Sequence, residues 1–384
     1  MAPLCRLKPG SLFCGVRPGV RALLRLASIP REQASCVLPW KDAVSGGEAV
    51  REGRSLGPVR PYRCRGRARG DSQQPWTASA DGQLEFEPDY ATLSKLLGVP
   101  LHLKAGTQSG VLALALDVWL SYELRRAGFD QDQVWPRPKT PRILPAAVSA
   151  VVKSLPATIR DQTAERLAKN SSIPGVTSSS AAILGKNYLK QVDVIITDWA
   201  TGPELLVSTK RMDSSYGKNA PNRIEESYGD AKNLRLRHPL AALGFLFGLR
   251  SDILHKEPKT AEWLFDLLAK LGQEDDAYHA TCLVLMDYAD DAALPDGQTE
   301  ADVTGILVPG LELEGQEAVP ASIPEARVEQ IVAMLPKVTI LSDRTPAELA
   351  PGRFLAAMVG RVLGASPVNM HEEARRRRTS VLNG

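Results

Sequence analysis

The feature that most constrains this chain is a pair of short apolar segments joined by a turn. A continuous β-branched run covers Val192–Asp198, and a second apolar segment covers Glu204–Lys210. The connection, Trp199–Pro203, contains Thr-Gly-Pro, which is typical of turns. Two such segments around so short a connection predict an antiparallel β-hairpin.

This hairpin is expected to bring an acid and a lysine together. If Asp198 pairs with Pro203 across the turn, Asp193 lies opposite Ser208. Side chains alternate along a strand, so Lys210 shares a face with Ser208 and lies one diagonal step from Asp193. An unpaired charge in an apolar run is costly, which favours a metal ion or an ion pair at Asp193. Two simpler interpretations stay open: Asp193 bonds a nearby turn, and Lys210 is a solvated strand end.

An acid beside a lysine suits the hydrolysis of phosphodiesters. Carboxylates hold Mg²⁺, which neutralises the scissile phosphate and lowers the pKa of the attacking water. A lysine beside the metal orients or deprotonates that water and balances charge in the transition state.

The order Val192-Asp193, sixteen intervening residues, then Lys210 resembles the signature of PD-(D/E)xK nucleases. Val192 stands where that family has proline, and Ser208 stands where it has an acid. One group of type II restriction enzymes also has serine there and takes the missing carboxylate from a glutamate on the next helix. Here Glu225 and Glu226 follow Lys210 by fifteen and sixteen residues.

The choice between the two glutamates depends on the face of their helix. The apolar residues Ile224, Tyr228 and Ala231 define a narrow stripe, which Glu225 flanks and Glu226 opposes. Glu225 is therefore the favoured ligand and Glu226 the alternative. Taken without the hairpin, both are solvated helix charges.

The resemblance implies a Mg²⁺-dependent endodeoxyribonuclease similar to type II restriction endonucleases. Asp193 and Glu225 would be the metal ligands, Lys210 would position the water, and Ser208 would hydrogen-bond within the site. The implied substrate is double-stranded DNA, cut by a homodimer in the cytoplasm. The chain carries no modification-enzyme motif, so a methyltransferase partner would be a separate protein.

Two other hypotheses remain. In one, Ser208 marks a lost metal site, and the chain is a non-catalytic member of the same fold that binds nucleic acid or protein. In the other, the chain is an unrelated α/β protein whose hairpin is only structural. Glu165, on a preceding helix, is a further acid to consider as a metal ligand at this site.

The chain divides into two regions by charge. Residues 1–75 carry fourteen Lys/Arg and five Asp/Glu, whereas the whole chain has a net charge of +3. We expect residues 1–80 to form a disordered basic arm, which also loosely resembles an organellar transit peptide. Residues 81–384 would form the nuclease domain, with its catalytic core at about 181–290. The longest apolar stretch, Pro239–Leu249, is too short to span a membrane.

The remaining patterns predict an α/β fold, with a central mixed β-sheet flanked by helices around a restriction-endonuclease-like core. The proline-rich segment Val134–Leu144 should be an extended connector, and Ser171–Ser180 and Arg211–Ala220 should be loops. Further strands are expected at Thr281–Tyr288 and Gly305–Pro309. Helices are expected at Val111–Ala127, Ala146–Lys169 with a break at Pro156, Ala181–Lys190, Pro221–Arg237, Pro239–Ile253, Glu325–Leu335 and Ala347–Leu363.

Overall fold

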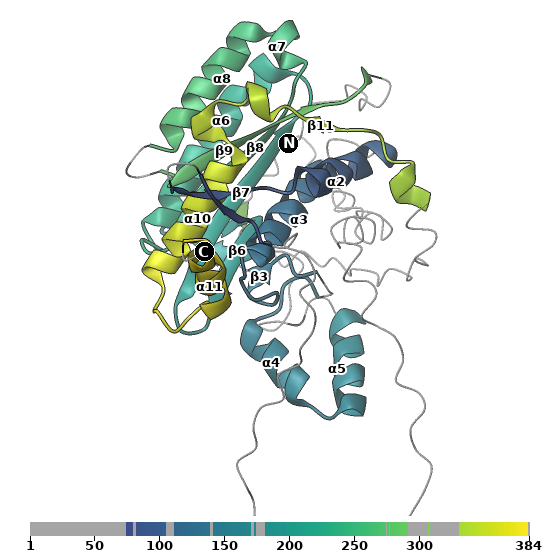
Figure 1. Ribbon diagram of the computed structural model, residues 1–384, viewed down its shortest axis with the longest axis vertical. Coiled ribbons are helices and arrows are strands. Elements are labelled where there is room, and N and C mark those ends of the chain that lie inside the picture. The colour runs from purple at the N-terminus through teal and green to yellow at the C-terminus, as the bar shows by residue number, and fades with distance from the viewer. Residues whose placement is uncertain are drawn as a thin grey trace, which may run out of the picture.

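The chain folds around a six-stranded mixed β-sheet with helices on both faces (Figure 1). The computed structural model describes residues 74–79, 82–104, 111–138, 141–169, 173, 181–273, 275, 277–290, 306–307 and 330–382. Most of the predicted basic arm, most of the predicted loop at Ser171–Ser180 and much of the predicted Glu325–Leu335 helix lie outside these residues. The α/β class and the mixed central sheet are confirmed.

The central sheet has the strand order β11-β9-β8-β7-β6-β3. Its first half along the chain is an antiparallel meander, and β7, β8 and β9 then run parallel to one another. The short edge strand β11 pairs antiparallel with β9. The strands are β3 (Val134–Trp135), β6 (Val194–Asp198), β7 (Gly202–Met212), β8 (Ala242–Arg250), β9 (Ala280–Asp287) and β11 (Thr339–Ile340).

Each face of the sheet buries its own hydrophobic core. Helices α2 (Tyr90–His102), α3 (Val111–Arg126) and α10 (Pro351–Ala365) cover one face, where Val194, Val207 and Leu246 are buried. Helices α6 (Tyr216–Arg235) and α8 (Pro258–Leu271) cover the other face, above Leu206, Phe245 and Leu283. Helix α6 is the crossover between β7 and β8, so its position relative to β7 is fixed at both ends.

Smaller elements surround this core. A hairpin of β1 (Trp76–Ala78) and β2 (Leu84–Phe86) precedes α2, so the described fold begins before residue 81, where the folded domain was expected to start. A small antiparallel sheet contains β4 (Ala182–Leu184), β5 (Leu189–Gln191) and β10 (Ile306–Leu307). The other elements are α4 (Ala146–Ser154), α5 (Ala157–Lys169), α7 (Ile253–Lys256), α11 (Glu372–Ser380) and the 3-10 turns η5 (Ser342–Arg344) and η6 (Ala347–Leu349).

Several sequence predictions are confirmed. The helix expected from Val111 is α3, and the helical segment from Ala146 to Lys169 is interrupted at Pro156, between α4 and α5. The two hairpin strands and the strand at Thr281–Tyr288 are present as β6, β7 and β9. The Gly305–Pro309 prediction overlaps β10, and residues 330–333 of the Glu325–Leu335 prediction are helical.

The helix predicted at Pro239–Ile253 is wrong, because most of this segment is strand β8. All nine residues of β8 are buried, since helices cover both faces of the sheet. A parallel strand buried on both faces is apolar at every position, so periodicity alone does not distinguish it from a buried helix. Gly244 fits the strand for a steric reason: a Cβ there would lie 2.8 Å from the ring of Phe354 on α10.

Three other predictions are corrected, one in the type of element and two in its bounds. The helix expected at Ala181–Lys190 is instead the β4–β5 hairpin, with Ala182 opposite Gln191. Helix α6 begins at Tyr216, within the loop expected at Arg211–Ala220, so Pro221 is the sixth residue of the helix and cannot donate the usual backbone hydrogen bond to the carbonyl of Gly217. The helix expected from Ala347 begins as a 3-10 turn, and α10 starts at Pro351.

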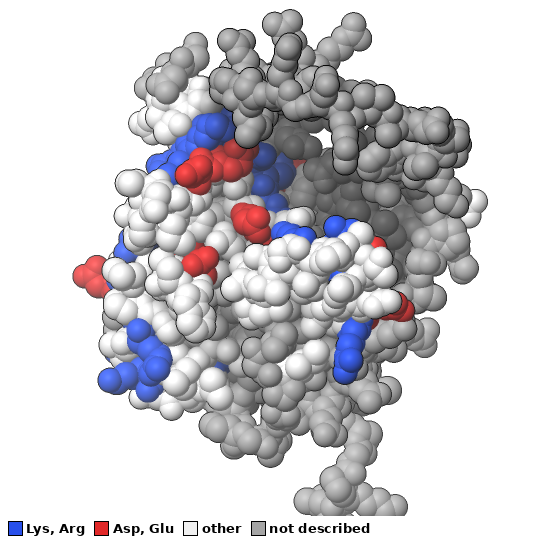
Figure 2. Space-filling model, turned by 90° about the horizontal axis from the view of Figure 1, so that it is seen from below, with Lys and Arg blue, Asp and Glu red and all other residues white. Residues whose placement is uncertain are grey.

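Among the described residues, no helix combines the length and apolar character needed to cross a membrane. Basic and acidic side chains are interspersed among uncharged residues on the face of the molecule seen from below (Figure 2).

Candidate active site on the β6–β7 hairpin

The hairpin reaches the predicted register by a different turn. Asp198 pairs with Gly202 instead of Pro203, which alone would shift the partners by one residue. An irregularity between Ile196 and Thr197 compensates, and Val194 pairs with Val207. A bulge of this kind inserts one residue and restores the alternation of faces beyond it. The expected correspondence of the strands at Asp193 and Ser208 is therefore retained.

Asp193 lies immediately before β6 and is fixed to the neighbouring strand. Its Oδ2 accepts a hydrogen bond of 2.7 Å from the backbone N–H of Thr209. Burial raises the pKa of Asp193, and the Thr209 bond and the positive charges of Lys210 and Lys190 offset this rise only in part. The site therefore holds a carboxylate whose negative charge is incompletely compensated.

A second acid, which the sequence analysis missed, meets the same threonine. Asp117 on α3 is buried and accepts a hydrogen bond from the Thr209 hydroxyl. Burial and the charge of Asp193 raise the pKa of Asp117 well above its usual range, against the Thr209 bond and the charge of Arg142. Glu165, the helix acid considered from the sequence, is exposed on α5.

Asp117 had a recognisable signal. It is the only charge in the first twelve residues of α3, which otherwise read VLALAL before it and VWLSY after it. A helix that is apolar on nearly all sides is buried, so its isolated acid cannot turn to solvent and must meet a polar partner. The sequence did not reveal which strand that partner occupies.

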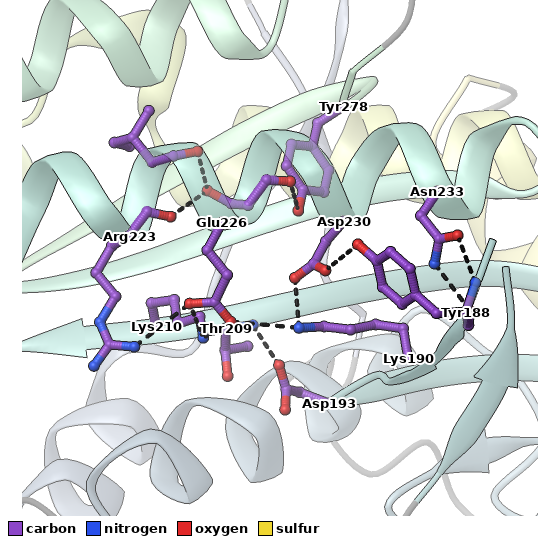
Figure 3. Close-up of polar contacts among 12 residues, drawn as sticks. Tyr188, Lys190, Asp193, Thr209, Lys210, Arg223, Glu226, Asp230, Asn233 and Tyr278 are labelled. Carbon is purple, nitrogen blue, oxygen red and sulfur yellow. Dashed lines mark hydrogen bonds and ion pairs between the residues drawn. The ribbon is translucent and has the colours of Figure 1, made fainter. Parts of the chain in front are cut away.

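Lys210 contacts Glu226 and not the favoured Glu225. Its Nζ lies 3.2 Å from both carboxylate oxygens of Glu226 (Figure 3). Burial opposes the ionisation of Glu226, but the charges of Lys210, Lys190 and Arg223 outweigh it and lower the pKa of this carboxyl. Glu225 is exposed.

The reversal of the two glutamates has a geometric cause. The buried face of α6 includes polar residues, Ser227, Asp230 and Asn233, beside Ala231 and Leu234. These rotate the centre of the buried face by roughly 90° from the stripe that Ile224, Tyr228 and Ala231 define, at about 100° per residue. Glu226 then flanks the buried face and Glu225 points away from it.

A second lysine enters the site from the β4–β5 hairpin. Lys190 is buried and its Nζ lies 2.5 Å from Asp230 and 3.4 Å from Glu226. The Tyr188 hydroxyl donates to Asp230 at 3.1 Å. Asn233 also holds the β4–β5 hairpin against α6, because its Oδ1 accepts a hydrogen bond of 2.8 Å from the backbone N–H of Asn187. The sequence pattern predicts a helix for this segment, so it gives no reason to place Lys190 in the site.

Ser208 is buried on the face of β7 that meets α6, and its side chain hydrogen-bonds the hydroxyl of Tyr278. That hydroxyl in turn donates to the backbone carbonyl of Ser227 at 2.9 Å. Ser208 therefore holds Tyr278 under α6. The expected hydrogen bond of Ser208 within the site is thus made to Tyr278 and not to Asp193 or Lys210.

The acids can be assessed as ligands for Mg²⁺. Among the described residues, no group of three or more His, Cys, Asp or Glu side chains is placed to hold a metal ion. Mg²⁺ commonly keeps several waters and binds proteins through one or two carboxylates. Asp117 and Asp193, both oxygen donors held by Thr209 and repelling each other, fit that requirement.

Comparisons with protein-family models, with curated proteins and with solved structures find no match to this chain.

Proposed function

We propose that this chain is a Mg²⁺-dependent endodeoxyribonuclease related to the type II restriction endonucleases. The observation that carries the proposal is that Lys210 contacts Glu226 on α6 and lies close enough to Asp193 for its charge to favour the ionisation of that acid. The contact of Lys210 with Glu226, sixteen residues further on, corresponds to the serine-containing variant of the PD-(D/E)xK pattern.

The proposal extends to a restriction-endonuclease-like core. Two features support it. One is the order of the elements: helix α3, the antiparallel strands β3, β6 and β7, the crossover helix α6 and the parallel strand β8. The other is the position of the acid–lysine pair on the β6–β7 hairpin. Helices cover both faces of the sheet. The proposed site lies between them, at the start of β6 and beside the part of β7 that α6 covers.

Each side chain has a role in this proposal. Asp193 and Asp117 would hold Mg²⁺, which supplies charge neutralisation at the scissile phosphate and an acidified water. Lys210 would orient that water and stabilise the developing negative charge. Glu226, instead of Glu225, would supply the carboxylate that the serine-containing restriction enzymes take from the helix after the lysine.

The partners follow from the proposed chemistry. The substrate would be double-stranded DNA, and cutting both strands is simplest with two sites, hence a homodimer. A cytoplasmic location and a separate methyltransferase partner belong to the same proposal.

A non-catalytic member of the same fold is the second candidate. Two contacts favour it: Lys210 already pairs with Glu226, and Ser208 turns to Tyr278. Such an internally neutralised site would bind no divalent cation. Calorimetric titration with Mn²⁺ separates the two candidates, because the nuclease requires binding that Asp193→Asn removes.

Cleavage of plasmid and phage DNA with Mg²⁺ tests the proposal directly. Wild-type protein should cut DNA, and Asp193→Asn should not. Intact DNA with both proteins, on methylated and unmethylated substrates, would reject the nuclease and favour the non-catalytic candidate.

A further inference from the structure

Three positive side chains from three different elements converge on one carboxylate (Figure 3). Lys190 lies on β5, Lys210 on β7 and Arg223 on α6, and all three pair with Glu226. Asp230 also pairs with Lys190, and Asp193 lies close enough for the charges of Lys210 and Lys190 to favour its ionisation. Because the fold itself sets the spacing of these elements, the cations are held together before any ligand arrives.

Glu226 is a poor match for the three cations. Its distances to Lys190, Lys210 and Arg223 are 3.4, 3.2 and 3.5 Å. Charge-assisted hydrogen bonds between nitrogen and oxygen are typically about 2.7–2.9 Å long. Elsewhere in this chain they reach 2.6 Å, as between Lys270 and Asp266. A carboxylate has two oxygens, so it cannot approach three separate cations closely at once.

A phosphate group would satisfy this arrangement better. It presents more acceptor oxygens in a tetrahedral arrangement, so each cation can meet its own oxygen. The cluster is open to solvent on one side, since the side chains of Lys210 and Glu226 are 21% and 20% exposed. It also lies against Asp193, whose ionisation the charges of Lys210 and Lys190 favour.

We propose that Lys190, Lys210 and Arg223 form a phosphate-binding subsite that Glu226 occupies as an internal counter-ion until a backbone phosphate displaces it. The subsite rests on the proposed function only for its ligand class, a nucleic-acid phosphate. Lys190 and Arg223 act here as binding residues alongside the acid–lysine pair. Removing the charge of Glu226 should then strengthen phosphate binding, because the anion no longer competes with an internal carboxylate.

The test is titration with inorganic phosphate, followed by ³¹P NMR, in buffer with a chelator so that no divalent metal contributes. Glu226→Gln should bind phosphate about tenfold more tightly than wild type, a change typical of removing one competing charge. Glu225→Gln is the matched control, since it removes an exposed charge one residue away and should leave the affinity unchanged.

Adding Arg223→Gln to Glu226→Gln should abolish the gain. This variant is preferred to one at Lys190, which would leave the buried Asp230 without its partner. Equal phosphate affinity of Glu226→Gln and Glu225→Gln, with both folded by circular dichroism, would overturn the subsite. So would an undiminished gain in the Arg223→Gln double variant.

The outcome is independent of cleavage. Tighter phosphate binding by Glu226→Gln in a protein that never cuts DNA would support the subsite and reject the nuclease. DNA cleavage by wild type without the Glu226→Gln gain would do the opposite.

Discussion

At the scale of single residues, the candidate site is defined by how two carboxylates and two lysines share partners. Thr209 holds both Asp193 and Asp117, and Glu226 faces both Lys190 and Lys210. Buried charges are tolerated only when paired or bound, so the arrangement constrains which substitutions the protein can accept.

The first residue-scale prediction compares the two adjacent glutamates. Glu226→Gln should lower the rate of Mg²⁺-dependent DNA cleavage by about 100-fold, a loss typical of removing a group that orients or neutralises a metal site. Glu225→Gln should stay within about twofold of wild type, because an exposed charge at the rim contributes little. Single-turnover cleavage measures both rates, and equal losses would contradict the assignment of Glu226.

The second prediction at the residue scale concerns the stability of the metal-free protein and its dependence on Asp117. Its pKa is raised above the usual 3.8 by burial and by Asp193. The stabilisation from protonated Asp117 is therefore complete only below pH 3.8 and is lost as the pH rises through the higher pKa of the folded state.

Asp117→Asn should remove this loss while keeping an acceptor for Thr209. At about pH 7 the free energy of unfolding should rise, because the neutral amide removes the cost of keeping a charge buried at this position. Urea unfolding with chelator present measures it, and the gain should shrink toward about pH 4. A destabilised variant at neutral pH would contradict the argument.

At the scale of elements, the sequence predicts the hairpin and its register because turn residues and β-branched runs are local signals. It does not predict β8, since a strand buried on both faces lacks alternation. It also misplaces the buried face of α6, where Ser227, Asp230 and Asn233 pack inward. Polar residues become buried only when partners from distant segments satisfy them, and those partners, Tyr188 and Lys190, are not visible in the local pattern.

The prediction at the scale of elements concerns the hydrogen bond between the start of β8 and the residue that precedes β9. The Leu243 N–H donates to Nδ1 of His279 at 2.9 Å, which requires an unprotonated ring nitrogen. Burial, with the charges of Arg361 and Arg235, lowers the pKa of His279 from 6.5 to about 4. The contribution of His279 to stability is therefore full above pH 6.5 and is lost as the pH falls toward about 4.

His279→Gln should make the pH dependence of unfolding shallower in that range, by less than about 1.4 kcal/mol per pH unit because the ring is only partly buried. Urea unfolding at a series of pH values compares wild type with the variant. Parallel curves would show that His279 does not titrate on unfolding.

At the scale of the whole molecule, charge does not by itself indicate DNA binding. The net charge of +3 arises from a basic N-terminal region and a mildly acidic remainder. Basic and acidic groups are mixed on the face in Figure 2, so any attraction for DNA must come from local groups such as those around Glu226.

The most direct test of the proposed active site is Mg²⁺-dependent cleavage of plasmid DNA by wild type and by Lys210→Ala. The proposed function predicts discrete fragments from wild type and at least about 100-fold slower cleavage by Lys210→Ala, with unchanged far-ultraviolet circular dichroism. Equal cleavage by the two proteins would contradict the role of Lys210, and the β6–β7 hairpin would then not be the active site.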